Sequence, residues 1–180
     1  MRVRQLLSTL LGTAVALAGM SLSTALAAPA QLRGKAVVIS WTEQRRERSP
    51  ATQQETNANR PFALTVYVSP SDQTFNRLSA GNAGSSDQAK GSKDRTRFAV
   101  RAVNFSGTRM TVTNTFSAGG ARQISATFDA GFSGCTGTVV IGRSGSGPIT
   151  QSKMGGGEIV VLSVSVGAVS CAITSGNPFQ

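Results

Sequence analysis

The chain has 180 residues, with 18 Lys and Arg against 8 Asp and Glu, a formal net charge of +10 and no histidine. The missing histidine excludes Ser-His-Asp and Cys-His catalytic sites, and also zinc and blue-copper sites that need an imidazole ligand. The excess positive charge favours solubility and attraction to polyanions, and it carries no information about the fold.

The first 27 residues have the pattern of a cleavable signal peptide. Arg2 and Arg4 precede an uncharged, Leu- and Ala-rich run over residues 6–20, and Ala25-Leu26-Ala27 is the small-x-small sequence that signal peptidase cleaves. We expect a mature chain of residues 28–180 in the periplasm or outside the cell, with a net charge of about +8. An uncleaved anchor is disfavoured because Ser, Thr and Gly interrupt the run, whereas a spanning helix needs about 20 mostly apolar residues. No later segment resembles a transmembrane span.

Both cysteines, Cys135 and Cys171, lie in the mature chain. A single pair in an exported protein predicts a disulfide. It would close a loop of about 37 residues and stabilise the fold by about 4 kcal/mol. A redox-active or metal-binding pair is disfavoured by the wide spacing and the lack of histidine. We therefore expect no metal and no cofactor.

Strand patterns dominate from residue 36 onward, because apolar residues recur at every second position. The segment Val37, Ile39 and Trp41 is one example, and Val160, Leu162, Val164 and Val166 are expected to share one face in the same way. The cysteines fall in phase with core positions, which predicts an inward-facing bridge between two strands. The alternating segments are 37–42, 62–68, 98–102, 110–116, 124–128, 135–141, 160–166 and 171–173. Eight or nine short strands predict a single all-β domain over residues 28–180, an antiparallel β-sandwich or barrel-like fold.

Four segments depart from this pattern. Residues 117–120 read as the loop of a hairpin between two strands. Residues 44–60 are polar and broken by Pro50, and residues 79–94 are of low complexity, so both are expected to be loops. Ser71 and Asp72 resemble a helix cap and predict a short helix over residues 73–78.

Basic residues gather in two places along the chain. If the fold brings them together, they form a patch for acidic polysaccharide or another envelope polyanion. The alternative is a solvated surface that keeps the protein soluble and protects strand edges, and this alternative is favoured. Nucleic acid is the least favoured partner, since one Trp and one Tyr cannot supply a stacking platform. The candidate residues are Arg45, Arg46, Arg48, Lys90, Lys93, Arg95, Arg97 and Arg101.

A glycosidase and a small outer-membrane barrel are two further hypotheses, and simpler explanations are favoured over both. Asp129 and Glu158 could act as the carboxylate pair of a glycosidase if they converge. Asp129 also fits a turn, however, and Glu158 also fits the start of a strand. A small outer-membrane barrel would need aromatic girdles that this composition lacks, and Pro178 interrupts what would be its closing strand.

Four segments carry a resemblance to known sequences: ISWTEQR (39–45), VNFSGTRMTVTNTFSAGG (103–120), FDAGFSGC (128–135) and SVSVG (163–167). Together they resemble a group of short, uncharacterised exported proteins of alphaproteobacteria. The resemblance implies a periplasmic or secreted location and supplies no catalytic residues. We therefore expect an exported, non-enzymatic cell-envelope protein with a binding or structural role. The alternative is a polyanion binder that uses the arginine clusters; the oligomeric state is left open.

Overall fold

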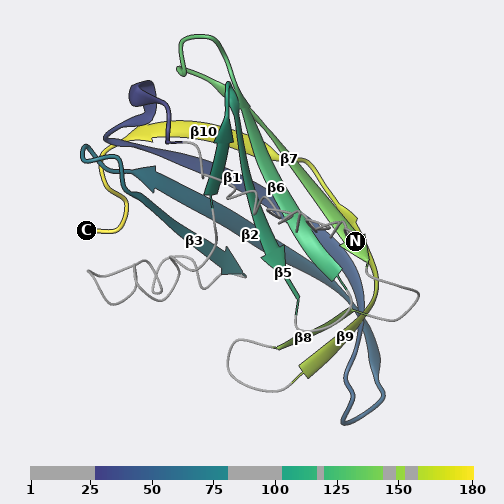
Figure 1. Cartoon of the computed structure of the whole chain (residues 1–180). Helices are drawn as coiled ribbons and strands as arrows, with labels where there is room; N and C mark the ends of the chain where they lie inside the picture. Colours follow the sequence, from purple (N-terminus) through teal and green to yellow (C-terminus); the bar gives the residue numbers. More distant parts are fainter. Residues whose placement is uncertain (1–26, 81–102, 117–119, 144–148, 153–157) are drawn as a thin grey trace, which may run out of the picture.

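Two antiparallel sheets pack face to face as a β-sandwich and are not closed into a barrel (Figure 1). The computed structural model describes residues 27–80, 103–116, 120–143, 149–152 and 158–180. The expected all-β fold is confirmed. In chain order the elements are η1 (Ala30–Leu32), β1 (Lys35–Arg48), β2 (Glu55–Val68), β3 (Thr74–Ala80), β4 (Val103–Ser106), β5 (Arg109–Thr115), β6 (Gly120–Phe128), β7 (Cys135–Arg143), β8 (Ile149–Ser152), β9 (Glu158–Val166) and β10 (Ser170–Ser175).

Sheet A is organised around the long strand β1. Its order is β3-β2-β1-β9-β8, and β10 also pairs with β1. On one edge β1 pairs with β2 along its whole length; on the other, its first half pairs with β10 and its second half with β9. Strands β9 and β10 therefore lie end to end along β1. At the break between them, the Gly167 amide donates to the Thr42 carbonyl at 2.9 Å.

Sheet B has the order β4-β5-β6-β7. The predicted hairpin is confirmed, since β5 and β6 pair from Arg109 with Thr127 to Thr115 with Ala121. Residues 117–119 of its loop lie outside the described residues, as do the expected strand over 98–102 and most of the segment 79–94.

The core lies between the sheets and follows the alternation seen in the sequence. Val37, Ile39 and Trp41 on β1 face inward and are at most 3 % exposed. They belong to one cluster that includes side chains of both sheets, with Val112 of β5 and Ile124 of β6 fully buried in it. Full burial of such a side chain contributes about 1.5–3 kcal/mol, so the shared core holds the two sheets together.

The expected disulfide is present and joins the sheets. Cys135 begins β7 in sheet B and Cys171 lies on β10 in sheet A, with their Cα atoms 5.6 Å apart. Both cysteines are half-buried and pack against the core cluster.

Two expectations about local structure are wrong. The segment 44–60 is not a loop, because it forms the second half of β1, a turn and the first half of β2; Figure 1 shows this hairpin extending past the ends of sheet B. The predicted helix over residues 73–78 is instead strand β3. Its cap-like residues close a hairpin turn, in which Ser69 Oγ accepts from the Gln73 amide at 2.9 Å and Asp72 has φ of 65°.

The phase of β9 also differs from the expectation. A register shift opposite Arg46 and Glu47 inserts one extra residue into β9. Ile159 and Val161 are therefore the buried residues before this β-bulge, and Val164 packs inward after it. No helix among the described residues is long and apolar enough to cross a membrane.

Candidate functional site

Charged side chains occupy the interior beside the second half of β1. Alternate residues of a strand point to the same face, so the inward row that begins with apolar residues continues with Glu43, Arg45 and Glu47. These three side chains are buried, with 1, 5 and 3 % of the residue exposed. Arg45 and Glu47 belong to the segment that was expected to be a polar loop, and with Glu43 they form a buried row of charges.

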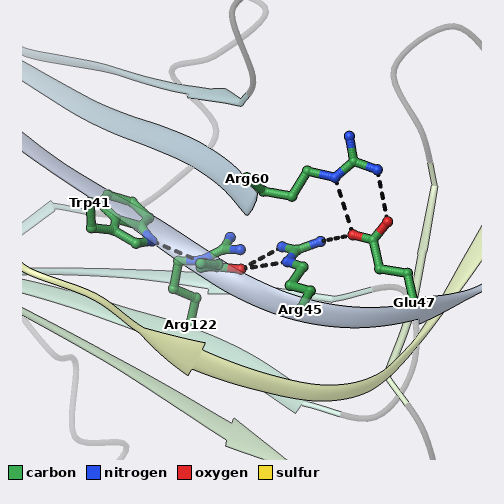
Figure 2. A network of polar contacts seen from close by, with 6 residues as sticks. Trp41, Arg45, Glu47, Arg60 and Arg122 are labelled. Carbon is green, nitrogen blue, oxygen red and sulfur yellow. Dashed lines mark hydrogen bonds and ion pairs between the residues drawn. The ribbon is translucent and has the colours of Figure 1, made fainter. Parts of the chain in front are cut away.

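Glu43 is the centre of this row and accepts hydrogen bonds from Trp41, Arg45 and Arg122, which are labelled in Figure 2. Trp41 Nε1 and Arg122 Nε donate to its Oε1 at 3.0 and 2.6 Å, and Arg45 Nε donates to its Oε2 at 2.8 Å. Arg122 comes from β6, so this carboxylate connects sheet A with sheet B.

Glu47 extends the contacts toward solvent. Arg60 on β2 donates from Nη2 at 2.7 Å and from Nε at 3.2 Å, and Arg45 Nη1 lies 3.5 Å from the same carboxylate. The Arg60 side chain is 43 % exposed, whereas that of Glu47 is 4 % exposed. We call the six residues the charged interior network: Trp41, Glu43, Arg45, Glu47, Arg60 and Arg122.

Aromatic rings complete the surroundings of Arg122. Its guanidinium carbon lies 4.4 Å from the ring centroid of Phe62 and 5.2 Å from that of Phe116. Phe62 in turn stacks on Trp41, with centroids 5.5 Å apart. Among the described residues, the Nη2 atom of Arg122 is buried without a hydrogen-bond acceptor, and these ring faces stabilise that end of the cation.

The pKa shifts follow from burial and from this pairing. Burial alone would raise the pKa of Glu43, but the hydrogen bond and charge of Arg122, together with Arg45 and Trp41, hold that pKa below its ordinary value. At Glu47, burial again acts to raise the pKa, but Arg60 and Arg45 outweigh it, so the pKa of Glu47 is also lowered. Burial lowers the pKa of Arg122 despite its bond to Glu43, and a guanidinium keeps its proton at neutral pH.

This network connects strands through buried ion pairs. Glu43 accepts from three residues and Glu47 from two, so both carboxylates hold neighbouring strands in place. Removing one partner of a buried ion pair destabilises a protein by about 3–5 kcal/mol. The network therefore fixes the β1–β2 hairpin to β6.

The opposite face of β1 is polar and hollowed. Two open depressions of about 410 and 400 Å³ follow each other along the strand, and we call them together the outer groove. The first has Ser40, Thr42, Ala63, Ser79 and Ser170 in its lining, and the second Gln44, Arg46, Asn57, Asn59, Ser163 and Ser165.

The outer groove begins where another group of side chains stops covering this face. Beside the first residues of β1, Phe179, which follows β10, packs with Tyr67, Phe75 and Ala36. Beyond that cluster, Gln44 and Arg46 are exposed.

The structure separates the three arginines of the first predicted cluster. Arg45 points into the interior and is engaged by Glu43 and Glu47. Arg46 lies on the outer face, where its Nε donates to Glu55 at 2.8 Å. Arg48 is half-buried, and its Nε is enclosed with no acceptor among the residues that the structure describes. The second cluster of Lys90, Lys93, Arg95, Arg97 and Arg101 lies outside the described residues.

The two carboxylates considered for glycoside hydrolysis are not brought together. Asp129 follows β6 beside the disulfide, whose Cys171 pairs with Ile39 of β1. Glu158 begins β9, near the residue that pairs with Arg48. Ile39 and Arg48 are separated by about 30 Å along β1, because each strand residue advances the chain by about 3.4 Å.

Asp129 has a structural role in its turn. It accepts from the Ser133 amide at 2.9 Å and from the Ser133 hydroxyl at 2.7 Å. The bond from the Ser133 amide is the main cause that lowers the pKa of Asp129, and the bond from the Ser133 hydroxyl lowers it further. Within the described residues no group of three or more His, Cys, Asp and Glu side chains is placed to hold a metal ion.

The charged interior network was missed by the sequence analysis. The signal was present, because Glu43, Arg45 and Glu47 continue the two-residue period of the apolar residues before them. Comparison with known proteins adds no relative, since no family model, curated protein or solved structure matches the chain.

Proposed function

We propose that this chain is an exported, non-enzymatic protein of the cell envelope that binds its ligand on the outer groove. The observation that carries the proposal is the polar outer face of β1, where exposed Gln44 and Arg46 and neighbouring Ser and Asn side chains line two successive depressions. Polar groups held on strands are fixed in position, so they lose little conformational freedom when a ligand binds.

The carboxylates support a role without catalysis. Glu43, Glu47 and Asp129 each serve a structural contact described above, and Glu55 and Asp72 are paired with Arg46 and Arg33. Glu43, Glu47 and Asp129 are thereby committed to holding the fold rather than to acid–base work.

Two features support export. The first 27 residues have the signal-peptide pattern, and disulfides persist outside the reducing cytosol. The corresponding test is intact-mass analysis of the protein from periplasm and medium after expression of the full chain. We expect a species that lacks residues 1–27, and a full-length species confined to the membrane fraction would overturn the export proposal.

Binding is tested by co-sedimentation of the mature protein with sacculi, outer-membrane fragments and extracellular polysaccharide purified from the producing cell. We expect retention by one of these fractions and loss of retention in Ser165→Trp, which fills the groove. The matched control is Thr127→Trp, which places the same side chain on the exposed face of sheet B. Failure of every fraction to retain the wild-type protein would overturn the proposed function.

A further inference from the structure

We infer that the outer groove takes a linear, hydroxyl-rich glycan that bears carboxylates, and that Arg46 binds the carboxylate in exchange for Glu55. This inference rests on the proposed function and names the ligand class of the same site. Three observations support it: the polar side chains of the lining, the long and open shape of the groove, and the exposed ion pair of Arg46 with Glu55.

The lining is an ordered array of hydrogen-bonding groups. The register of the strands places Gln44 between Asn59 and Ser165, and Arg46 between Asn57 and Ser163. Neighbouring strands lie about 4.8 Å apart, so each row presents three polar side chains across about 10 Å. Hydroxyl and amide groups both donate and accept, which suits the hydroxyl groups of a sugar chain.

The groove is long rather than deep. Its two depressions follow β1 from Ser40 to Arg46, a distance of about 20 Å along the strand. Both are open to solvent along their length. This shape matches an extended chain lying along β1 better than a compact small molecule, which favours an enclosed pocket.

The outer-facing charge in the groove lining is positive. Arg46 belongs to the lining, whereas the charge of Arg45 is turned inward to Glu43 and Glu47. Among the described residues, none of those that line the two depressions is a carboxylate, and Glu55 lies beside the lining as the partner of Arg46. A chain that carries carboxylates is therefore complementary in charge, and a guanidinium can bind a carboxylate through two parallel hydrogen bonds.

Arg46 is held in a contact that a ligand can replace. Its partner Glu55 is 38 % exposed and its own side chain is 58 % exposed, and surface pairs of this kind contribute little to stability. A ligand carboxylate can take the place of Glu55 without leaving a buried charge. Glu55 thereby acts as a competitor that sets the affinity for acidic chains.

The described aromatic rings near this surface are engaged with one another or with the interior. Trp41 and Phe62 border the groove, but they stack on each other beside Arg122 of sheet B. Tyr67 is packed against Phe75 at the covered end of the same face. Single-stranded nucleic acid, which needs stacking platforms, is therefore a poorer match than a polyuronate.

The test measures binding of the mature protein to alginate, a polyuronate, with dextran as the neutral comparison. We expect Arg46→Gln to weaken alginate binding by about tenfold, because it removes a charge-assisted bond. We expect Glu55→Gln to tighten binding by about threefold or more, because it releases Arg46. Arg109→Gln removes an exposed charge on sheet B and should leave the affinity within about twofold.

Three other outcomes would each overturn a different part of the inference. Equal alginate binding by wild type, Arg46→Gln and Ser165→Trp, with unchanged melting temperatures, would overturn the groove as the glycan site. Dextran binding as tight as alginate binding would overturn carboxylate recognition. Retention of the protein by an envelope fraction without any affinity for alginate would overturn the ligand class and leave the proposed function standing.

Discussion

Glu43 on β1 and Arg122 on β6 are 79 residues apart in the sequence, and their side chains meet at 2.6 Å between the two sheets. The contact sits at the boundary between the apolar core and the charged part of the interior, where Trp41 and Phe62 stack. The contacts between the two sheets therefore include apolar packing, the disulfide beside the first half of β1 and a buried ion pair beside its second half.

The substitution Glu43→Gln tests the weight of this ion pair. Glutamine is similar in size and can still accept from Trp41, but it leaves Arg122 buried without its counter-charge and Arg45 with only the longer contact to Glu47. We expect the free energy of unfolding in urea to fall by about 3–5 kcal/mol. The matched control is Glu55→Gln, which breaks an exposed pair and should cost at most about 1 kcal/mol. Similar losses for both variants would contradict the central role of Glu43.

The same network predicts how stability depends on pH. The pKa values of Glu43 and Glu47 lie below the ordinary value of 4.5 in the folded protein. A carboxylate with a lowered pKa stabilises the fold fully above its unfolded-state pKa, and this contribution is lost as the pH falls through the folded-state pKa. Once the carboxylates are protonated, Arg45, Arg60 and Arg122 face one another without compensation.

We therefore expect the melting temperature to be nearly constant from about pH 7 to pH 5 and to fall steeply below about pH 4.5. Thermal unfolding followed by circular dichroism at a series of pH values measures this. In Glu47→Gln one of the two carboxylates is absent, so the acid-induced loss should be shallower than in the wild type. A main loss between pH 7 and pH 5, or an unchanged slope in Glu47→Gln, would contradict the assignment.

Strands with apolar alternation could be predicted from the sequence, whereas strands whose inward residues are charged could not. Residues 37–42 were recognised because Val37, Ile39 and Trp41 alternate with smaller or polar residues. The next inward residues are Glu43, Arg45 and Glu47, and what allows them into the interior is pairing with Arg60 and Arg122. Those partners lie on β2 and β6, so the compensation is visible only once the strand register is known.

Turn chemistry limited the prediction in a different way. Serine side chains that cap a backbone amide occur both at helix starts and in tight turns, so Ser71 and Asp72 suited either structure. The turn over residues 69–73 uses Ser69 as the cap and is followed by Phe75, which stacks on Tyr67 across the hairpin. This cross-strand contact stabilises residues 74–80 as a strand rather than as a helix. The bulge in β9 likewise depends on its pairing with β1.

The disulfide tests the attachment of sheet B to sheet A. Cys135→Ala combined with Cys171→Ala removes the covalent link between β7 and β10 while keeping small apolar side chains. We expect a loss of about 4 kcal/mol, because the bridge restricts a loop of about 37 residues in the unfolded chain. The melting temperature should fall by roughly 10–15 °C. Two titratable thiols in the unreduced wild-type protein, or an unchanged melting temperature in the double variant, would argue against a structural bridge.

Close packing of β7 against β1 and β10 depends on Gly137 of β7. A Cβ atom added there would lie 2.9 Å from Val169 Cγ1 and 3.1 Å from Ile39 Cγ2, both of which belong to branched side chains packed at the core. Those neighbours would have to move, and overpacking of this kind destabilises proteins by about 1–3 kcal/mol. We therefore expect Gly137→Ala to lower the free energy of unfolding by that amount.

Gly142→Ala is the matched control for this prediction, because Gly142 lies on the same strand and an added Cβ would meet nothing closer than the Ala121 carbonyl oxygen at 4.0 Å. Alanine also restricts the unfolded chain more than glycine does, so this control should be neutral or stabilising by up to about 1 kcal/mol. Urea denaturation of the two variants with the disulfide intact separates the close approach from the general effect of replacing a strand glycine. Equal stability changes in both would mean that β7 does not approach β1 and β10 as closely as the contacts of Gly137 require.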